Sequence, residues 1–97
     1  MDASIINGKF HFVQYGGQIM KQFQILLRSV ADVQDFVTLV MVQPFQVLVG
    51  HPNHLLNGKN FMSMFSLDYS QPVDVQVDCD EDQFVRFRQA AARFLAA

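Results

Sequence analysis

The stretch of sequence that decides the fold is Val73-Asp74-Val75-Gln76-Val77. Its three valines alternate with two polar residues, which is the two-residue period of a β-strand with one apolar side. The pattern predicts a strand that buries its valines and turns Asp74 and Gln76 toward water. It therefore indicates a sheet that other elements cover on one face only.

The residues after this strand predict a helix that runs to the C-terminus. Asp80, Glu81 and Asp82 crowd its start, where carboxylates suit the helix dipole. The apolar residues beyond them recur at helical spacing, which predicts one stripe packed against the sheet. These residues are Phe84, Phe87, Ala91, Phe94 and Leu95.

Before this strand, the sequence predicts a short helix and, earlier still, a hairpin. Residues 60–65 place apolar side chains three and four positions apart, which is typical of a helix of a couple of turns. The hairpin strands are predicted at residues 45–49 and 54–56, with turn residues at 50–53 between them. Such a short connection predicts two neighbouring antiparallel strands.

A longer helix is predicted over residues 30–42. Ser29 suits its start, because a serine side chain can accept a backbone N–H bond, and Asp32 favours its first turn. Pro44 ends the helix, since proline has no N–H to donate and disfavours helix in the residue before it. The predicted apolar stripe consists of Val33, Phe36, Val37, Val40 and Met41.

A strand over residues 21–28 comes first, since Phe23 and Ile25 alternate there with glutamines. The elements then run β-α-β-β-α-β-α, without a repeat or a linker long enough to divide them. Because each helix has one apolar stripe, the economical packing places the helices on one face of an antiparallel sheet. The sequence predicts one two-layer α+β domain, an open-faced sandwich, over residues 20–97.

Residues 1–19 are predicted to be a translated leader that results from a start codon placed too far upstream. Gly16 and Gly17 can be encoded by a ribosome-binding GGAGG sequence shortly before the codon of Met20. The natural protein would then begin at Met20. The alternative is that the two glycines form a turn after a genuine extra strand over residues 9–15.

Composition limits the class of protein. A chain of 97 residues that is 51% hydrophobic can bury one core, and its single cysteine, Cys79, excludes an internal disulfide. Nine Asp and Glu against seven Lys and Arg, without a basic run, disfavour a nucleic-acid partner. No stretch approaches the roughly 20 apolar residues of a membrane span, and no secretory signal is evident. We therefore expect a cytoplasmic protein that is not inserted in a membrane.

Residues 57–67 carry a resemblance to a known family. They read NGKNFMSMFSL and are similar to the segment of the HPr phosphocarriers of the sugar phosphotransferase system that runs from the third strand to a Ser-Leu pair after the second helix. Residues 65–73, FSLDYSQPV, resemble a divergent HPr-like branch. The resemblance extends over residues 20–97. It implies a four-stranded antiparallel sheet in the order 1-4-2-3 with three helices on one face.

The same resemblance implies that the chemistry of the family is missing. A working HPr carries phosphate on a histidine at the start of its first helix, followed by Ala-Arg-Pro, whereas residues 28–33 here read RSVADV. Ser29 lies at or next to the histidine position, but a phosphoserine ester is not the high-energy phosphoramidate that a relay needs. A regulatory serine of many HPr proteins aligns with Asn60, which cannot accept phosphate.

The family also implies an interaction surface, because partners dock on the first two helices of HPr proteins. Phe61 and Met62 match that surface in character, and one or two of the large apolar residues of this short helix are expected to be exposed. With Ser29 and Val30 they form the predicted interaction surface. The alternative is that Phe61 and Met62 belong to the core.

We predict no catalytic residue, cofactor or metal site. His51 and His54 are three residues apart but have no cysteine or carboxylate cluster beside them, and acidic neighbours disfavour a reactive Cys79 thiolate. The prediction is therefore a non-enzymatic HPr-like module that binds proteins or regulators of the phosphotransferase system. The alternatives are a phosphocarrier that uses an atypical acceptor and a small-ligand-binding α+β domain.

Overall fold

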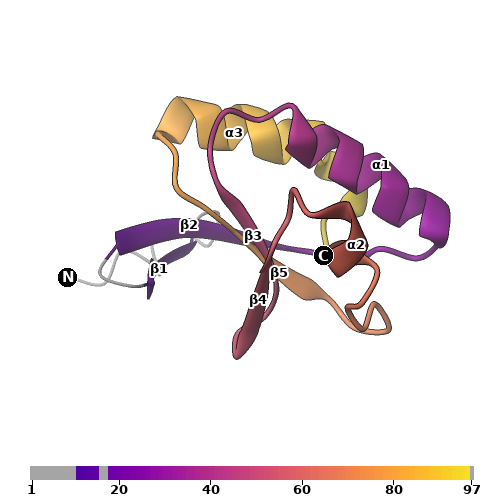
Figure 1. Cartoon of the computed structure of the whole chain (residues 1–97). Coiled ribbons are helices and arrows are strands. Elements are labelled where there is room, and N and C mark those ends of the chain that lie inside the picture. The colour runs from indigo at the N-terminus through magenta and orange to yellow at the C-terminus, as the bar shows by residue number, and fades with distance from the viewer. Residues whose placement is uncertain (1–10, 16–17, 97) are drawn as a thin grey trace.

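The computed structural model describes residues 11–15 and 18–96, which form an antiparallel sheet with helices on one face (Figure 1). The sheet has five strands in the order β1-β2-β5-β3-β4. The strands are β1 His11–Tyr15, β2 Gln18–Ile25, β3 Val47–His51, β4 His54–Asn57 and β5 Val73–Val77. The helices are α1 Val30–Met41, α2 Phe61–Met64 and α3 Glu81–Ala90, followed by a 3₁₀ turn, Ala92–Phe94.

The strand order of the predicted domain is confirmed. When β2, β3, β4 and β5 are numbered one to four along the chain, they lie side by side in the order 1-4-2-3. Strand β5 holds the centre because it pairs antiparallel with both β2 and β3, while β4 returns beside β3 as a hairpin. The α+β class is likewise confirmed. Within the described ranges, no helix combines the length and the apolar character needed to cross a membrane.

Strand β1 pairs antiparallel with β2, with Val13 opposite Met20. An extra strand at residues 11–15 agrees with the alternative interpretation of the N-terminal segment. Residues 1–10 and 16–17 lie outside the described residues, and pairing within the full chain does not test where translation begins. The start at Met20 therefore stays a prediction.

The core lies between the sheet and the helices, with Phe87 of α3 at its centre. Its ring centroid lies 5.6 Å from that of Phe23 on β2 and 6.4 Å from that of Phe36 on α1. Phe45, which precedes β3, adds an edge-on contact at 5.6 Å. Such tilted and edge-on rings combine a large buried apolar area with favourable quadrupole contacts. The helical stripes predicted from the sequence therefore meet in one aromatic cluster.

Helix α1 follows the prediction closely, apart from its last turn. Its buried side chains are Val33, Phe36, Val37 and Val40. The helical spacing predicts that Met41 belongs to the same stripe, but Met41 is 57% exposed. It is the last helical residue, and the one before it, Val40, already takes the buried position at that level of the stripe. The prediction for Met41 is therefore wrong.

The predicted solvent-facing side of β5 is also wrong. Asp74 and Gln76 are each only 6% exposed. Gln24 Nε2 donates to Asp74 Oδ1 at 2.9 Å, from the neighbouring strand β2. Gln76 Nε2 donates to Gln22 Oε1, also on β2, at 3.1 Å. Strand β5 lies between β2 and β3, so side chains of the neighbouring strands cover Asp74 and Gln76. The two glutamines of β2 also give them hydrogen-bond partners.

The C-terminal helix is shorter than predicted. Helix α3 ends at Ala90, and the 3₁₀ turn that follows leads to an isolated β-bridge between Leu95 and Ile25. Leu26 N donates to Phe94 O at 2.7 Å. The end of the chain is therefore hydrogen-bonded to the end of β2 and to Leu26 after it. A helix that continued to the C-terminus could not form these hydrogen bonds.

Candidate functional site

The start of α1 is held by hydrogen bonds between side chains and backbone. Ser29 Oγ accepts the N–H of Asp32 at 3.1 Å, and Asp32 Oδ2 accepts the N–H of Arg28 at 3.0 Å. Arg93 donates to Asp32 Oδ1 at 3.1 Å. The bond from the Arg28 backbone, opposed by some desolvation and assisted by Arg93, lowers the pKa of the Asp32 carboxyl. The Ser29 hydroxyl is therefore the N-cap of the helix, as predicted.

Replacing this cap is expected to cost stability. The substitution Ser29→Ala removes an acceptor from the Asp32 N–H, so the free energy of unfolding should fall by about 1 kcal/mol. Urea denaturation followed by circular dichroism measures the change. Ser66→Ala is the matched control, because that exposed hydroxyl only donates to Ser63 O in the turn after α2. Equal losses in the two variants would contradict the capping role.

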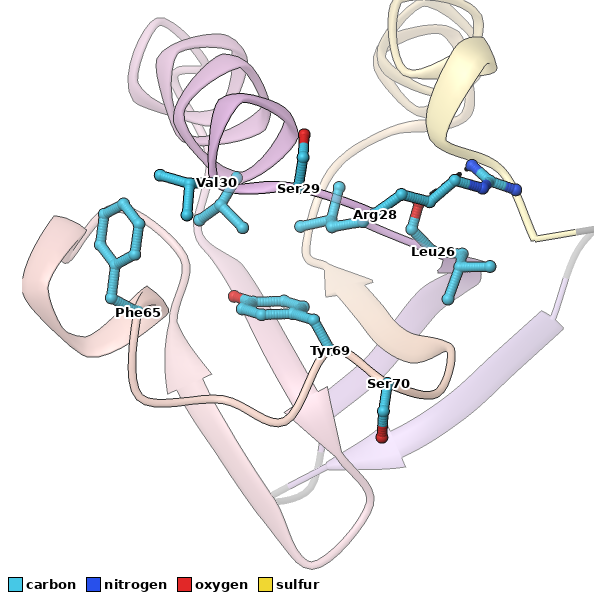
Figure 2. Close-up of a pocket in the computed structure, with 9 residues that line it drawn as sticks. Leu26, Arg28, Ser29, Val30, Phe65, Tyr69 and Ser70 are labelled. Atoms are coloured by element: carbon cyan, nitrogen blue, oxygen red, sulfur yellow. Dashed lines mark hydrogen bonds between the residues drawn. The ribbon is translucent and has the colours of Figure 1, made fainter.

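Beside the start of α1 lies a pocket of about 580 Å³. Its walls come from the segment after β2, the first turn of α1 and the segment after α2 (Figure 2). The lining is mainly apolar, and Arg28 carries the one formal charge among the described residues that line it. The lining residues are Leu26, Leu27, Arg28, Ser29, Val30, Val33, Phe65, Tyr69 and Ser70.

Exposed apolar side chains gather at the start of α1 and on α2, two elements that contact each other. Val30 is 63%, Phe61 43%, Met62 78% and Phe65 39% exposed. The rings of Phe61 and Phe65 meet edge-on at 4.8 Å, whereas Met64 is fully buried. Val30, Phe61, Met62 and Phe65 are called the apolar patch below. Val30 and Phe65 also line the pocket, so the patch and the pocket share an edge.

The structure places each predicted interaction residue in this region. Ser29 and Val30 line the pocket, and Phe61 and Met62 lie on α2 with their side chains exposed. The expectation of one or two exposed residues on the short helix is too low. Of the four large apolar side chains over residues 60–65, the predicted helix, three are exposed, because an α2 of four residues with Phe65 as its C-cap turns only Met64 fully into the core.

Tyr69 is a pocket residue that the sequence did not single out. Its Oη donates to Met64 O at 2.5 Å, and burial raises its pKa to about 12. The phenol is thus neutral near pH 7 and already hydrogen-bonded, so Tyr69 serves as an apolar wall. The sequence pointed to its neighbourhood only through the resemblance of residues 65–73 to a family segment.

The other chemically active side chains lie outside the pocket lining. His51 and His54 face each other across the β3–β4 hairpin, and the described residues contain no group of three His, Cys, Asp or Glu side chains placed to hold a metal ion. Burial raises the pKa of the Cys79 thiol, against a smaller opposing effect of Lys21. A raised pKa keeps Cys79 in the less reactive thiol form.

Comparison of the chain with protein-family models, with curated proteins and with solved structures finds no match. The pocket and the apolar patch are the candidate functional features of the described residues.

Proposed function

We propose that this chain is an HPr-like protein that binds other proteins through its apolar patch and does not relay phosphate through a histidine. The observation that carries the proposal is the exposure of four large apolar side chains at the start of α1, on α2 and at the C-cap of α2. Contiguous exposed apolar patches mark interaction surfaces on soluble proteins. Methionine and phenylalanine are also enriched at the centres of protein interfaces.

Two features support the HPr-like part of the proposal. The order 1-4-2-3 among β2, β3, β4 and β5 is compatible with the HPr sheet. Residues 57–67 resemble the family segment that leads through the second helix. Since a fold alone does not fix a function, the partner class rests on this resemblance. We propose a cytoplasmic regulator or decoy among the proteins of a sugar phosphotransferase system.

The start of α1 argues against phosphoryl relay. Residues 28–33 contain no histidine, and the Ser29 hydroxyl is occupied as a helix cap. The Asp32 carboxylate stands in the first turn, where it would repel an incoming phosphoryl group. Asn60, which aligns with the regulatory serine of the family, caps α2 by accepting the N–H of Ser63 at 3.1 Å. The proposed function is therefore binding and not catalysis.

Phosphorylation by enzyme I separates this proposal from an atypical phosphocarrier. The chain is incubated with phosphoenolpyruvate and enzyme I of its own organism, and its intact mass is then measured by mass spectrometry under neutral conditions. We expect no phosphate-sized gain in mass, while a conventional HPr from the same organism is labelled in parallel. A gain would establish the phosphocarrier alternative, and mapping it would identify the acceptor.

Competition tests the binding surface directly. If the chain is a decoy, an excess of it should slow the labelling of a conventional HPr by enzyme I. Met62→Gln should weaken this inhibition about tenfold, because exposed apolar anchors at the centre of an interface carry much of its binding energy. Met41→Gln is the matched control, since Met41 is also exposed but lies at the far end of α1.

The outcomes of this competition are decisive for enzyme I as the partner. Inhibition that Met62→Gln relieves and Met41→Gln does not supports docking on the apolar patch. Undiminished labelling of the conventional HPr at a large excess of the chain would contradict a decoy role toward enzyme I. Equal effects of the two substitutions would place the contact outside the patch.

A further inference from the structure

We propose that the pocket beside the start of α1 binds a small amphiphilic anion, which is a ligand with an apolar body and a single carboxylate at one end. The pocket shares Val30 and Phe65 with the apolar patch, but ligand binding is tested without a partner protein and does not depend on the proposed docking. The proposal rests on the volume of the pocket, on its apolar walls and on the position of its single charged lining residue.

The pocket has the size and the lining of a small-molecule site. Its volume of about 580 Å³ falls within the range of roughly 300 to 1,000 Å³ that is usual for such sites. Leu27 and Val33 are buried residues of its lining, and Phe65 and Tyr69 supply aromatic surface. Such walls favour an apolar ligand body, because its contact area leaves water on binding.

The neutral polar side chains around the pocket already have partners within the protein. Tyr69 Oη donates to Met64 O, and Ser29 Oγ accepts the N–H of Asp32. Ser70 Oγ donates to Asp68 Oδ1 at 2.7 Å. These three hydroxyls are the neutral polar side chains among nine lining residues, so a ligand that relied on hydrogen bonds would find few groups to bind. This favours an apolar body over a sugar-like one.

Arg28 gives the pocket a charged end. Its guanidinium is exposed, and the one hydrogen bond that the described residues offer it is a long contact of 3.5 Å to Leu26 O. Figure 2 shows the guanidinium at the Leu26 side of the pocket, pointing away from Phe65 at the opposite side. A ligand whose anion lies beside the guanidinium would have its charged end at the rim of the pocket, and its apolar body would extend back past Leu26 to reach Tyr69.

One carboxylate suits this charged end better than a phosphate. The neighbouring acid, Asp32, accepts bonds from the Arg28 backbone and from Arg93, and its pKa is lowered, so it is ionised near pH 7. A doubly charged head group would meet stronger repulsion from Asp32 than a singly charged one. The geometry thus favours a monoanion with an apolar body.

Three matched probes test the charge and the body of the ligand. They are 4-phenylbutyrate, the neutral 4-phenylbutan-1-ol and the cationic 4-phenylbutylamine, each titrated into the full chain and followed by backbone amide NMR. We expect 4-phenylbutyrate to bind with a dissociation constant of about 1 mM, as its size allows. It should bind about three to five times more tightly than the alcohol, and the amine should bind most weakly.

Two pairs of variants locate the site. Arg28→Gln should remove the preference for 4-phenylbutyrate and leave the alcohol unaffected, whereas Arg86→Gln makes the same charge change at an exposed position on α3 and should change nothing. Phe65→Ala should weaken all three probes by about threefold or more, because it removes part of the apolar wall. Met62→Ala, which lies outside the lining, should weaken none of them.

These results are independent of docking by the apolar patch. Arg28→Gln replaces an exposed side chain and retains the backbone N–H that Asp32 accepts, so the variant is expected to fold. Equal affinity for the acid and the alcohol would overturn the anionic part of the proposal. Absence of binding by 4-phenylbutyrate at about ten times the expected dissociation constant would overturn the site itself. Neither result would alter the competition with a conventional HPr.

Discussion

The substitution Phe87→Ala is expected to lower the free energy of unfolding by about 3 to 5 kcal/mol. Phe87 is 1% exposed, and its ring meets those of Phe23, Phe36 and Phe45 from three other segments of the chain. Removing the Phe87 ring leaves a cavity, because Phe23 and Phe36 also pack against Phe84 and Phe94 and so cannot readily move to fill it. Because small domains have a total stability of about 5 to 15 kcal/mol, the loss should be evident in urea denaturation.

Phe61→Ala is the matched control for this experiment. Phe61 is 43% exposed, and its described ring contact is with Phe65 alone. We expect the control to lose less than about 1 kcal/mol, since Phe61 lies outside the buried core cluster and nearly half of its surface is already exposed. Similar losses in both variants would contradict the position of Phe87 at the centre of the core.

The parts of the fold that sequence predicts well are those set by neighbouring residues. Helix α1 begins after Ser29 because the serine side chain caps its first turn, and it ends before Pro44 because proline has no backbone N–H to donate. Both effects reach no farther than one helical turn. The four-strand order 1-4-2-3 was implied by a family resemblance. Periodicity gives the type of each element but does not say which strands become neighbours.

The parts that sequence missed depend on what packs around an element. The alternation in residues 73–77 correctly separates two faces of β5, but it carries no information about how far the polar face is buried. Asp74 and Gln76 are buried in pairs with Gln24 and Gln22, which lie about 50 residues earlier in the chain. Likewise, the C-terminal residues leave the helical conformation because Leu95 forms a β-bridge with Ile25, a residue that is distant in the sequence.

The candidate site divides in the same way. The exposed character of Phe61 and Met62 follows from a short helix that has more large apolar residues than it can bury. The pocket follows only from the meeting of residues 26–33 with residues 65–70, and neither segment has a binding motif of its own. Tyr69 became a candidate through this juxtaposition and not through its neighbours in sequence.

Gly50→Ala is expected to lower the free energy of unfolding by about 3 kcal/mol or more. Gly50 has a φ of 150°, which L side chains rarely adopt, and an added Cβ would lie 2.3 Å from the backbone oxygen of His54. Relief would require β4 to move away from β3. The sequence assigned Gly50 to a turn, yet the structure pairs it with Leu55 and Asp74 inside the sheet. Thermal and urea denaturation measure the loss.

Gly58→Ala is the control, because it adds the same methyl group directly after the same hairpin. Its Cβ would approach Val49 Cγ2 at 3.0 Å and Val47 O at 3.2 Å, so that shifts of a few tenths of an ångström relieve the contacts, whereas the 2.3 Å approach to His54 O at Gly50 requires a much larger movement. We therefore expect a smaller loss than for Gly50→Ala. Because three residues join β4 to α2, separation of the hairpin should also disturb the apolar patch and the pocket wall at Phe65. A Gly50→Ala variant as stable as Gly58→Ala would contradict the close packing of β3 on β4.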